Sequence, residues 1–405
     1  MANAASPFEP LHLSHYDANY LRELVHVFVQ HQVGSYERYL HDEHERLDKK
    51  RWKQVLQRDN THVFSELQSS NPADDPGFVN QPQPAELADL PALLMVGQME
   101  GSLDDAMYGV MTPSVASMRL KYFYSGDQLA NGAVLTSIDR PSTMDPFQSL
   151  TVKWVEGYQS PMLRPLVSSR DFVYMEATGF TKLSDGELVA YHLLHSVHFP
   201  QTPKTRNNTR GTISVCALYR QRNHSIVDLY CRASVNSGGR VARSIGVKYA
   251  AVSLISARKM VRCAHLKKLT WLLRVRDAGN GDTILRGEPK CIGCGQKPGI
   301  FATDIGSCSL CKRALCSSCR QKVDLGFASS NGSFFKKKFW FCTYCIDEAA
   351  RTSSRAVACG EYVDSRIAEP TPWSSGPTNS SSPSSSERSD DWGSLDKRYI
   401  NLMPR

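Results

Sequence analysis

The chain has 405 residues, of which 41% are hydrophobic and 22% are charged. That length exceeds what one hydrophobic core normally organises, so we expect two folded units joined by linkers. No apolar run of about eighteen residues occurs and the N-terminal segment is polar and acidic, so we expect neither a membrane-spanning helix nor a secretory leader. The net charge of +8 is modest for this length and does not predict a nucleic-acid partner. These features predict a cytoplasmic protein.

An amphipathic helix is predicted near the start of the chain. From residue 17 to about 41, apolar residues recur at helical spacing, and Leu21 and Val25 fall on the same side. Residues 52–67 have strand character, and the prolines of residues 71–91 predict a solvent-exposed loop.

Strand signals dominate the middle of the chain. Residues 93–100 predict a strand, and Ser102 is a suitable N-cap for a following helix because Asp105 stands three positions later. Five later runs have the length and the β-branched or aromatic content of strands: 151–154, 171–178, 187–199, 213–218 and 226–231. The pair Asp185-Gly186 permits the positive φ of a tight hairpin turn. We therefore expect an antiparallel meander.

A long helix is predicted after these strands. Residues 241–274 contain no proline and place apolar residues at helical spacing, with Arg and Lys between them. Residues 276–290 read as a Gly-rich connector. Beyond residue 350 the chain is rich in Ser and Pro and cannot bury enough apolar surface to order itself, so we expect a disordered tail over 351–405.

Cysteine spacing is the strongest chemical signal in the sequence. Eight cysteines form four C-x2-C pairs: Cys291 and Cys294, Cys308 and Cys311, Cys316 and Cys319, and Cys342 and Cys345. At this spacing a tight turn can aim two thiolates at one tetrahedral zinc ion. Four pairs make two closed sites without an open coordination position, so the predicted zinc ions are structural. The alternative, buried free cysteines, requires four identical pairs to arise by chance.

The four other cysteines lack this spacing. Cys216, Cys231, Cys263 and Cys359 are expected to be small apolar residues of the core or the tail. We call residues 291–345, which hold the four pairs, the cysteine module.

The full pattern C-x2-C-x13-C-x2-C-x4-C-x2-C-x22-C-x2-C resembles the FYVE zinc finger. The resemblance implies interleaved ligands, with one zinc ion on Cys291, Cys294, Cys316 and Cys319 and the other on Cys308, Cys311, Cys342 and Cys345. The basic Arg-His-His-Cys-Arg motif and the Trp-x-x-Asp element of that family are missing, so the resemblance covers the scaffold and not the phosphoinositide site. A RING finger normally has a central His, which is missing here, and this weakens a ubiquitin-ligase interpretation.

Positive charge gathers in the cysteine module. The candidate contacts for an anionic or phosphoinositide membrane are Lys312, Arg313, Lys336, Lys337 and Lys338. The last three lie in a run that interleaves lysine with aromatic residues, a pattern that suits a membrane interface. In the alternative, which we favour, this run is an edge strand whose lysines discourage pairing and whose aromatic residues cover the zinc core.

Residues 15–275 resemble the START-like lipid-transfer superfamily. The stretches that carry the resemblance are Trp52-Lys-Gln-Val, Gly101-Ser-Leu-Asp-Asp, Ser169-Arg-Asp-Phe-Val-Tyr-Met, Ser184-Asp-Gly-Glu-Leu-Val-Ala-Tyr and His195-Ser-Val-His-Phe-Pro. The resemblance implies an α+β helix-grip fold, in which an antiparallel sheet wraps a long C-terminal helix and encloses a cavity for an apolar ligand. Candidate lining residues are Phe172, Tyr174, Leu193, Val197, Val215, Ala217, Val252 and Ile255. Each can also be an ordinary core residue.

No catalytic signature is visible. The sequence lacks a Gly-x-Ser-x-Gly elbow, a Walker loop, a dinucleotide fingerprint and a His-Glu-x-x-His pair. On a strand His195 faces away from His192 and His198, so these three histidines cannot converge on a metal ion. We therefore expect no enzyme.

The predicted organisation is a START-like lipid-binding domain over 15–275, a FYVE-like double zinc finger over 286–350 and the tail over 351–405. We expect a non-enzymatic protein that binds or senses an unidentified lipid and is positioned by the cysteine module at membranes or at a protein partner. By resemblance, those membranes include endosomal ones. The alternative is a zinc-finger interaction adaptor without lipid cargo, which predicts a well-packed interior.

Overall fold

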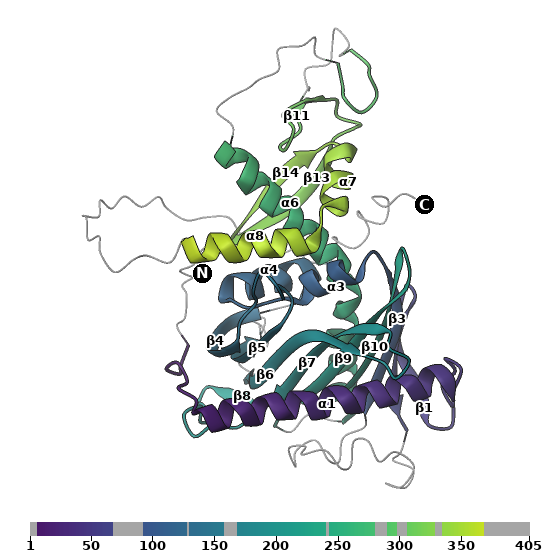
Figure 1. Ribbon diagram of the computed structural model, residues 1–405, viewed down its shortest axis with the longest axis vertical. Coiled ribbons are helices and arrows are strands. Elements are labelled where there is room, and N and C mark those ends of the chain that lie inside the picture. Colours follow the sequence, from purple (N-terminus) through teal and green to yellow (C-terminus); the bar gives the residue numbers. More distant parts are fainter. Residues whose placement is uncertain are drawn as a thin grey trace, which may run out of the picture. The chain divides into compact units, whose positions relative to one another are not determined.

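The computed structural model describes residues 6–67, 92–127, 129–157, 168–239, 243–279, 290–297, 306–328 and 334–367. One compact unit covers Met1–Asp364. The START-like part and the cysteine module therefore belong to the same unit (Figure 1). The predicted loop at 71–91, most of the predicted connector and the end of the predicted tail lie outside the described residues.

Runs of consecutive strands are separated by helices along the described chain. The helices are α1 (His15–His41), α3 (Leu103–Val110), α4 (Val115–Ser125), α5 (Arg243–Leu254), the 3₁₀ helix η2 (Ile255–Lys259), α6 (Met260–Gly279), α7 (Thr343–Arg351) and α8 (Ser354–Ile367). The strands of the large sheet are β1 (Trp52–Arg58), β2 (Thr61–Glu66), β3 (Leu93–Glu100), β4 (Leu129–Asp139), β5 (Ser149–Gly157), β6 (Ser169–Lys182), β7 (Leu188–Ser196), β8 (Asn208–Arg210), β9 (Thr212–Asn223) and β10 (Ile226–Asn236). The cysteine module adds β11 (Gly306–Ser307), β12 (Ala314–Leu315), β13 (Gln321–Ala328) and β14 (Phe334–Phe341).

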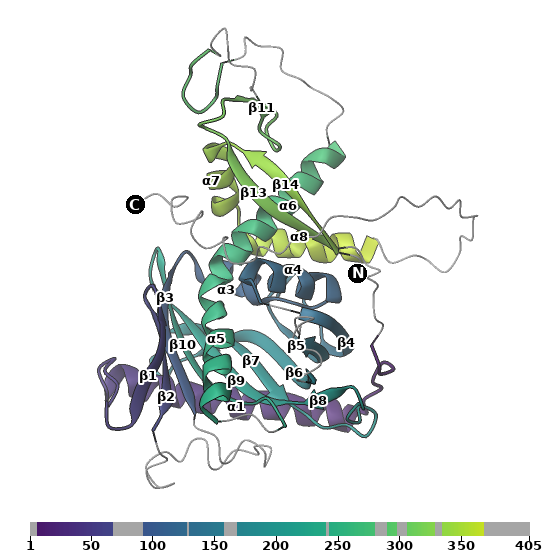
Figure 2. The ribbon, with the colours of Figure 1, turned by 180° about the vertical axis from the view of Figure 1, so that it is seen from behind.

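The large sheet has the strand order β1-β2-β3-β10-β9-β7-β6-β5-β4, with antiparallel neighbours throughout and β8 parallel to β6. Helix α1 lies along one face of the sheet (Figure 1). The series α5-η2-α6 crosses the other face (Figure 2). This is the helix-grip arrangement that the START-like resemblance implies, so the predicted α+β fold class is confirmed. We call the side between the sheet and helices α3 to α6 the interior.

Side-chain alternation gives the sheet two different faces. On β6, Val173, Met175 and Ala177 pack in the cluster that contains α1. Tyr174 and Glu176, which alternate with them, face the interior. Because successive strand residues point to opposite faces, one strand contributes to both layers.

Several predicted elements are observed. The Ser102 side chain accepts a hydrogen bond from the backbone N–H of Asp105 and forms the predicted capping box. The backbone N–H of Gly186 donates to the Leu183 carbonyl in the predicted β6–β7 hairpin, and Gly186 has a φ of 87°. These local signals suffice because both depend on neighbours in the sequence.

The long C-terminal helix differs from the prediction. It tightens into the 3₁₀ segment η2 between α5 and α6 instead of continuing as one α-helix. Directly after this segment, α3 approaches so closely that a Cβ on Gly109 would stand 2.0 Å from the Met260 carbonyl oxygen. Only a glycine permits this contact between the two helices.

The predicted disordered tail begins too early. Residues 354–367 form α8, and its Val357 is fully buried in the interior core. This segment contains the strong helix formers Ala, Arg and Glu, and the Ser- and Pro-rich composition begins only after it. The composition of the whole tail concealed this local helix signal. Residues 368–405 lie outside the described residues.

Candidate metal centre and lipid-binding interior

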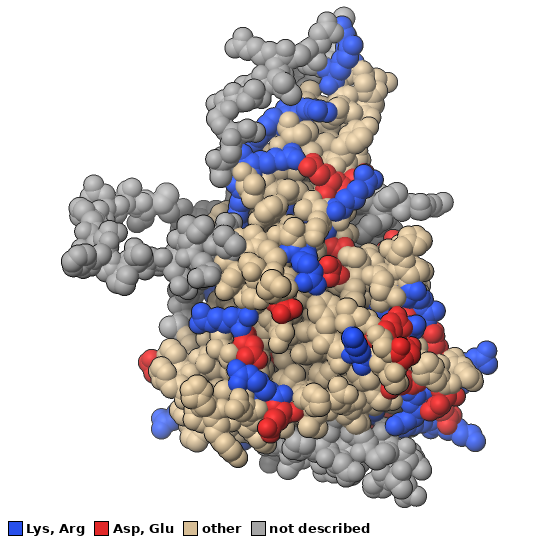
Figure 3. All heavy atoms as spheres, viewed as in Figure 1, with Lys and Arg blue, Asp and Glu red and all other residues tan. Residues whose placement is uncertain are grey.

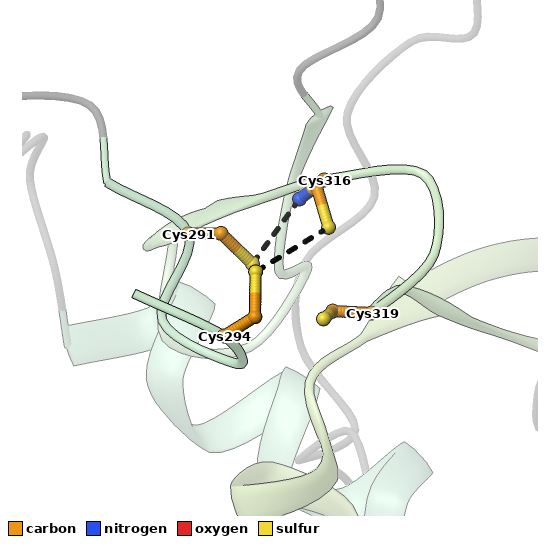
Figure 4. A group of neighbouring side chains, drawn as sticks. All are labelled: Cys291, Cys294, Cys316 and Cys319. Atoms are coloured by element: carbon orange, nitrogen blue, oxygen red, sulfur yellow. Dashed lines mark hydrogen bonds between the residues drawn. The ribbon is translucent and has the colours of Figure 1, made fainter. Parts of the chain in front are cut away.

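The eight paired cysteines form two groups. The thiol atoms of Cys291, Cys294, Cys316 and Cys319 lie within 4.8 Å of one another, as do those of Cys308, Cys311, Cys342 and Cys345. Figure 4 shows the first group, whose sulfur atoms point toward one another from two separate turns. These are the two interleaved sets that the FYVE-like resemblance implies.

The sulfur spacing fits a tetrahedral ion. Zinc–sulfur bonds of about 2.3 Å place the corners of a tetrahedron about 3.8 Å apart. The Sγ atoms of Cys294 and Cys316 are 3.9 Å apart, and those of Cys311 and Cys342 are 3.8 Å apart. Four thiolates suit zinc and occupy every position of its tetrahedron, so an ion held here would be structural.

The same backbone turn recurs in all four pairs. The carbonyl of the first cysteine accepts a hydrogen bond from the N–H four residues later, and the donors are Gly295, Lys312, Arg320 and Ile346. Two of these donors, Gly295 and Lys312, have φ values of 70° and 60°. The backbone N–H of Cys316 also donates to the Cys291 sulfur at 3.4 Å. N–H groups aimed at sulfur stabilise the thiolate form, which is the form that binds metal.

Gly293 lies between the two cysteines of the first pair, and a side chain at this position is expected to disturb metal binding. A Cβ on Gly293 would lie 2.9 Å from the Cys319 Sγ. In Gly293→Ala the Cys319 side chain must therefore move. We expect the metal affinity of the first group to fall about 10-fold or more, as it does for substitutions of residues that contact metal ligands. Competition with a chromophoric chelator measures this affinity.

Gly295→Ala is the matched control for Gly293→Ala. A Cβ on Gly295 meets nothing within 4 Å, so only its left-handed backbone is strained. We expect Gly295→Ala to lower the free energy of unfolding by about 1 kcal/mol and to reduce metal affinity less than Gly293→Ala does. Equal zinc affinity in Gly293→Ala and the wild type would contradict the described geometry.

The cysteine module is packed against the START-like part. A single hydrophobic cluster joins Leu120 and Tyr124 of α4, Leu269 and Leu273 of α6 and the module's buried residues. The module residues in this cluster include Cys291, Cys308, Leu310, Leu315, Val323, Leu325, Phe341, Cys342 and Cys345. The metal ligands and the helices that cover the interior thus share one core.

A tyrosine bridges the two parts with hydrogen bonds. The Tyr124 hydroxyl accepts from the backbone N–H of Gly326 in β13 at 3.1 Å and lies 2.9 Å from the Thr270 hydroxyl of α6. Beside it, the rings of Phe123 and Phe334 have centroids 5.3 Å apart. These directional contacts fix the position of β13 on α4.

A buried lysine makes a second connection. Lys268 of α6 donates to a carboxylate oxygen of Asp105 at 2.7 Å, to the carbonyl of Ala350 at the end of α7 and to the carbonyl of Thr352 between α7 and α8. The Ser354 hydroxyl donates to the same Asp105 oxygen at 2.6 Å. Asp105 therefore holds together α3, α6 and the start of α8.

The basic candidates of the cysteine module are exposed. Lys312, Arg313, Lys336, Lys337 and Lys338 all reach solvent. Figure 3 shows Lys and Arg side chains spread over this part of the surface, with few Asp and Glu. In the same hairpin Phe341 is fully buried, whereas Phe335 is 58% exposed. The favoured edge-strand interpretation expected the aromatic residues of this run to cover the zinc core. Phe341 fits this expectation and Phe335 does not, and membrane contact stays a prediction.

Five of the eight candidate cavity residues face the interior. Phe172, Tyr174, Val215, Ala217 and Ile255 belong to its two hydrophobic clusters or pack against them. Their role as ligand contacts stays a prediction.

The other three candidates are corrected by the structure. Leu193 and Val197 pack in the cluster on the α1 side of the sheet. Val252 is 59% exposed, because α5 turns Ala250, Ala251 and Leu254 inward instead. Whether a strand residue faces the interior depends on which of the two alternating faces it occupies, and for a helix residue it depends on the rotation of the helix about its axis. Both were misjudged from the sequence.

Solvent reaches part of the inward face. Leu194, Ile213 and Val215 are only half-buried, although their neighbours Leu193 and Ser214 on the opposite face are buried under α1. Inward-facing apolar residues that keep contact with water are unusual in a filled core. This part of the interior therefore exposes apolar surface to solvent.

A polar cluster borders this surface and was missed in the sequence. Glu176 accepts hydrogen bonds from Lys153, from the Thr112 hydroxyl at 3.0 Å and from His192 Nε2 at 2.7 Å. Glu176 is the cross-strand neighbour of half-buried Leu194. Burial and the nearby lysine charges lower the pKa of His192, so this histidine is neutral and donates to the carboxylate.

His192 and His195 lie on opposite faces of the sheet, as predicted, so the three histidines do not converge on a metal ion. His192 faces the interior, whereas His195 lies on the other face, 3.1 Å from the Ser214 hydroxyl and beside the Phe28 ring. Of the unpaired cysteines, Cys216, Cys231 and Cys263 are buried as expected.

Neither the protein-family models nor the curated proteins contain a match to the chain. Solved structures that resemble it include the following three. Human StAR-related lipid transfer protein 5 has a TM-score of 0.39 and 16% identity, covering 59% of this chain and 98% of its own. Human STARD10 has a TM-score of 0.38 and 11% identity, covering 60% and 84%. The STAR-related lipid transfer protein of Xanthomonas axonopodis has a TM-score of 0.36 and 15% identity, covering 52% and 99%.

The strand order, register and helix placement of this chain define its fold. The FYVE-like assignment of the cysteine module stays a prediction. Among the described residues, every helix is too short or too polar to span a membrane.

Proposed function

We propose that the chain is a non-enzymatic lipid-binding protein of the cytoplasm whose START-like interior holds one lipid. The observation that carries this proposal is the solvent-accessible apolar surface at Leu194, Ile213 and Val215. A lipid chain placed there removes this surface from water, and each buried methylene contributes about 0.8 kcal/mol. The polar cluster at Glu176 offers partners for a head group at the edge of the same surface.

The proposed role of the cysteine module is to hold two structural zinc ions and to present a contact surface. The paired sulfur distances support zinc. Its exposed lysines and Phe335 support contact with an anionic membrane or a protein partner. Because the module shares a core with α4 and α6, it also supports the helices over the lipid site.

A lipid-extraction assay with a cavity-filling variant tests the proposal. We expect the protein to remove lipid from sucrose-loaded vesicles, so that lipid stays in the supernatant after the vesicles are pelleted. Ile213→Trp places a large ring on the accessible inward surface and is expected to reduce extraction about 10-fold, because it occupies the volume of the ligand. The control Leu188→Trp makes the same kind of change at a position that is 48% exposed. Extraction that is equal in both variants would contradict the assigned site.

A second candidate function is a zinc-finger adaptor without cargo. The packed half of the interior favours it, since Met95, Met107 and Tyr219 are fully buried there. The adaptor predicts no extracted lipid and an unaffected Ile213→Trp variant.

A further inference from the structure

Buried positive charge exceeds buried negative charge in the interior. Lys153 and Lys121 both pair with one carboxylate, that of Glu176, and the Lys121 Nζ lies 3.8 Å from it. The side chains of Lys121, Lys153 and Glu176 are 14%, 2% and 4% exposed. One carboxylate thus balances two ammonium groups, and His192 does not change this balance because it is neutral.

A third lysine adds to this imbalance. Lys267 of α6 is buried, with 5% of its surface exposed, and donates to the backbone carbonyls of Tyr108 at 2.8 Å and Met111 at 2.9 Å. Among the described residues no carboxylate pairs directly with its Nζ, and Glu361 of α8 acts on it only through its charge. Even if Glu361 is counted in full, three cations face two anions.

An uncompensated buried charge is costly, so the protein must either lose a proton or bind an anion. Lys121 is the cation with access to solvent, and it reaches Glu176, the strand neighbour of half-buried Leu194. A charged head group at Lys121 would therefore have the accessible apolar surface beside it for its chain.

We propose that the interior ligand is an anionic lipid whose carboxylate or phosphate head pairs with Lys121 and Lys153 while its chain lies along Leu194, Ile213 and Val215. This inference rests on the proposed lipid-binding function and names the class of its ligand. In this proposal Lys121 determines the preference of the protein for anionic over neutral lipids.

Proton uptake accompanies such binding. Burial lowers the pKa of Lys153 and of Lys267, with Lys121, Glu176, His192, Cys263 and Glu361 as the surrounding charged or titratable groups. An arriving anion favours the protonated lysines and raises these pKa values. Titration calorimetry at pH 8 in two buffers of different ionisation heat is expected to detect protons taken up on binding.

Matched pairs of lipids test the inference. Palmitate is compared with hexadecanol, and phosphatidic acid is compared with diacylglycerol of the same acyl chains. The wild type is expected to bind the anionic member of at least one pair about 10-fold more tightly, since a charge-assisted hydrogen bond contributes about 1.5–3 kcal/mol. The pair that shows the larger preference identifies the head group as carboxylate or phosphate.

Variants at Lys121 assign the preference to this residue. Lys121→Met is expected to lose the preference for anionic lipid, and Lys121→Arg is expected to keep it, with circular dichroism and thermal unfolding confirming that both fold. If the wild type binds both members of each pair equally, the inference is wrong while the lipid-binding function stands. If none of the four lipids binds, the proposed function itself fails.

Discussion

Replacing Cys316 and Cys319 with Ser is expected to release one metal ion and to destabilise the START-like part together with the cysteine module. Zinc supplies about 10–16 kcal/mol of folding free energy to small zinc-binding segments. The module's Leu325 and Phe341 pack in the same cluster as Leu269 of α6. Unfolding the module therefore uncovers α4 and α6, and we expect faster hydrogen exchange in both helices and a lower Tm.

Metal analysis by mass spectrometry and hydrogen exchange measure the two parts of this expectation. Cys359→Ser is the control, because Cys359 lies outside both thiol groups and donates to the Thr143 carbonyl. This control should keep two zinc ions and the exchange pattern of the wild type. If the double variant lost one zinc ion while exchange in α4 and α6 stayed unchanged, the shared core would not couple the two parts.

Asp105→Asn is expected to cost about 3–5 kcal/mol in the free energy of unfolding at pH 7. The substitution leaves the ammonium group of Lys268, which is fully buried, without its carboxylate. It also weakens the hydrogen bond from Ser354 and the capping box of α3. Unfolding by urea measures the change.

The pH dependence gives a second readout for Asp105. Burial alone would raise the pKa of this carboxyl group, but the hydrogen bond of His265 and the charge of Lys268 overcome that effect and hold the pKa well below its usual value. The pair therefore stabilises the fold above the unfolded pKa of about 3.9, and this contribution is lost as the pH falls toward the depressed pKa. In Asp105→Asn this acid-dependent loss should be missing.

Asp104→Asn is the matched control for this buried pair. Asp104 is the exposed neighbour of Asp105, and its one described ion pair, with Arg355, has a distance of 3.7 Å. Its removal should change stability by less than about 1 kcal/mol. Equal losses in the two variants would show that Asp105 does not act through the buried pair.

The metal ligands could be predicted because their chemistry depends on local spacing. A C-x2-C turn aims two thiolates regardless of the rest of the fold, and the interleaved order followed from the resemblance of the whole pattern. The same holds for Ser102 and Asp105, whose capping box lies within one helical turn. For these features, the neighbours in sequence are also the neighbours in space.

The polar cluster could not be found in this way, because it depends on register between distant strands. Lys153 stands on β5 and Glu176 on β6, and they meet only through the pairing that sets Lys153 opposite Tyr174. One signal was available: Leu150, Val152 and Trp154 alternate on β5, so Lys153 had to face the other side. That side is the interior, although a lysine in a strand is ordinarily assigned to solvent.

Helix α4 escaped prediction for a related reason. Leu120 and Tyr124 face the core of the cysteine module, Met118 faces the interior and Lys121 reaches Glu176. A helix between two cores has no single apolar stripe, so its hydrophobic pattern lacks a clear helical period.

One chain is expected to carry two structural zinc ions and an interior lipid. Native mass spectrometry of the full-length protein purified from a eukaryotic host counts both in one spectrum. We expect two zinc ions and one lipid-sized adduct that dissociates on denaturation, with the mass of an acidic lipid. A spectrum with two zinc ions and no adduct, even after incubation with the four test lipids, would contradict the proposed lipid binding.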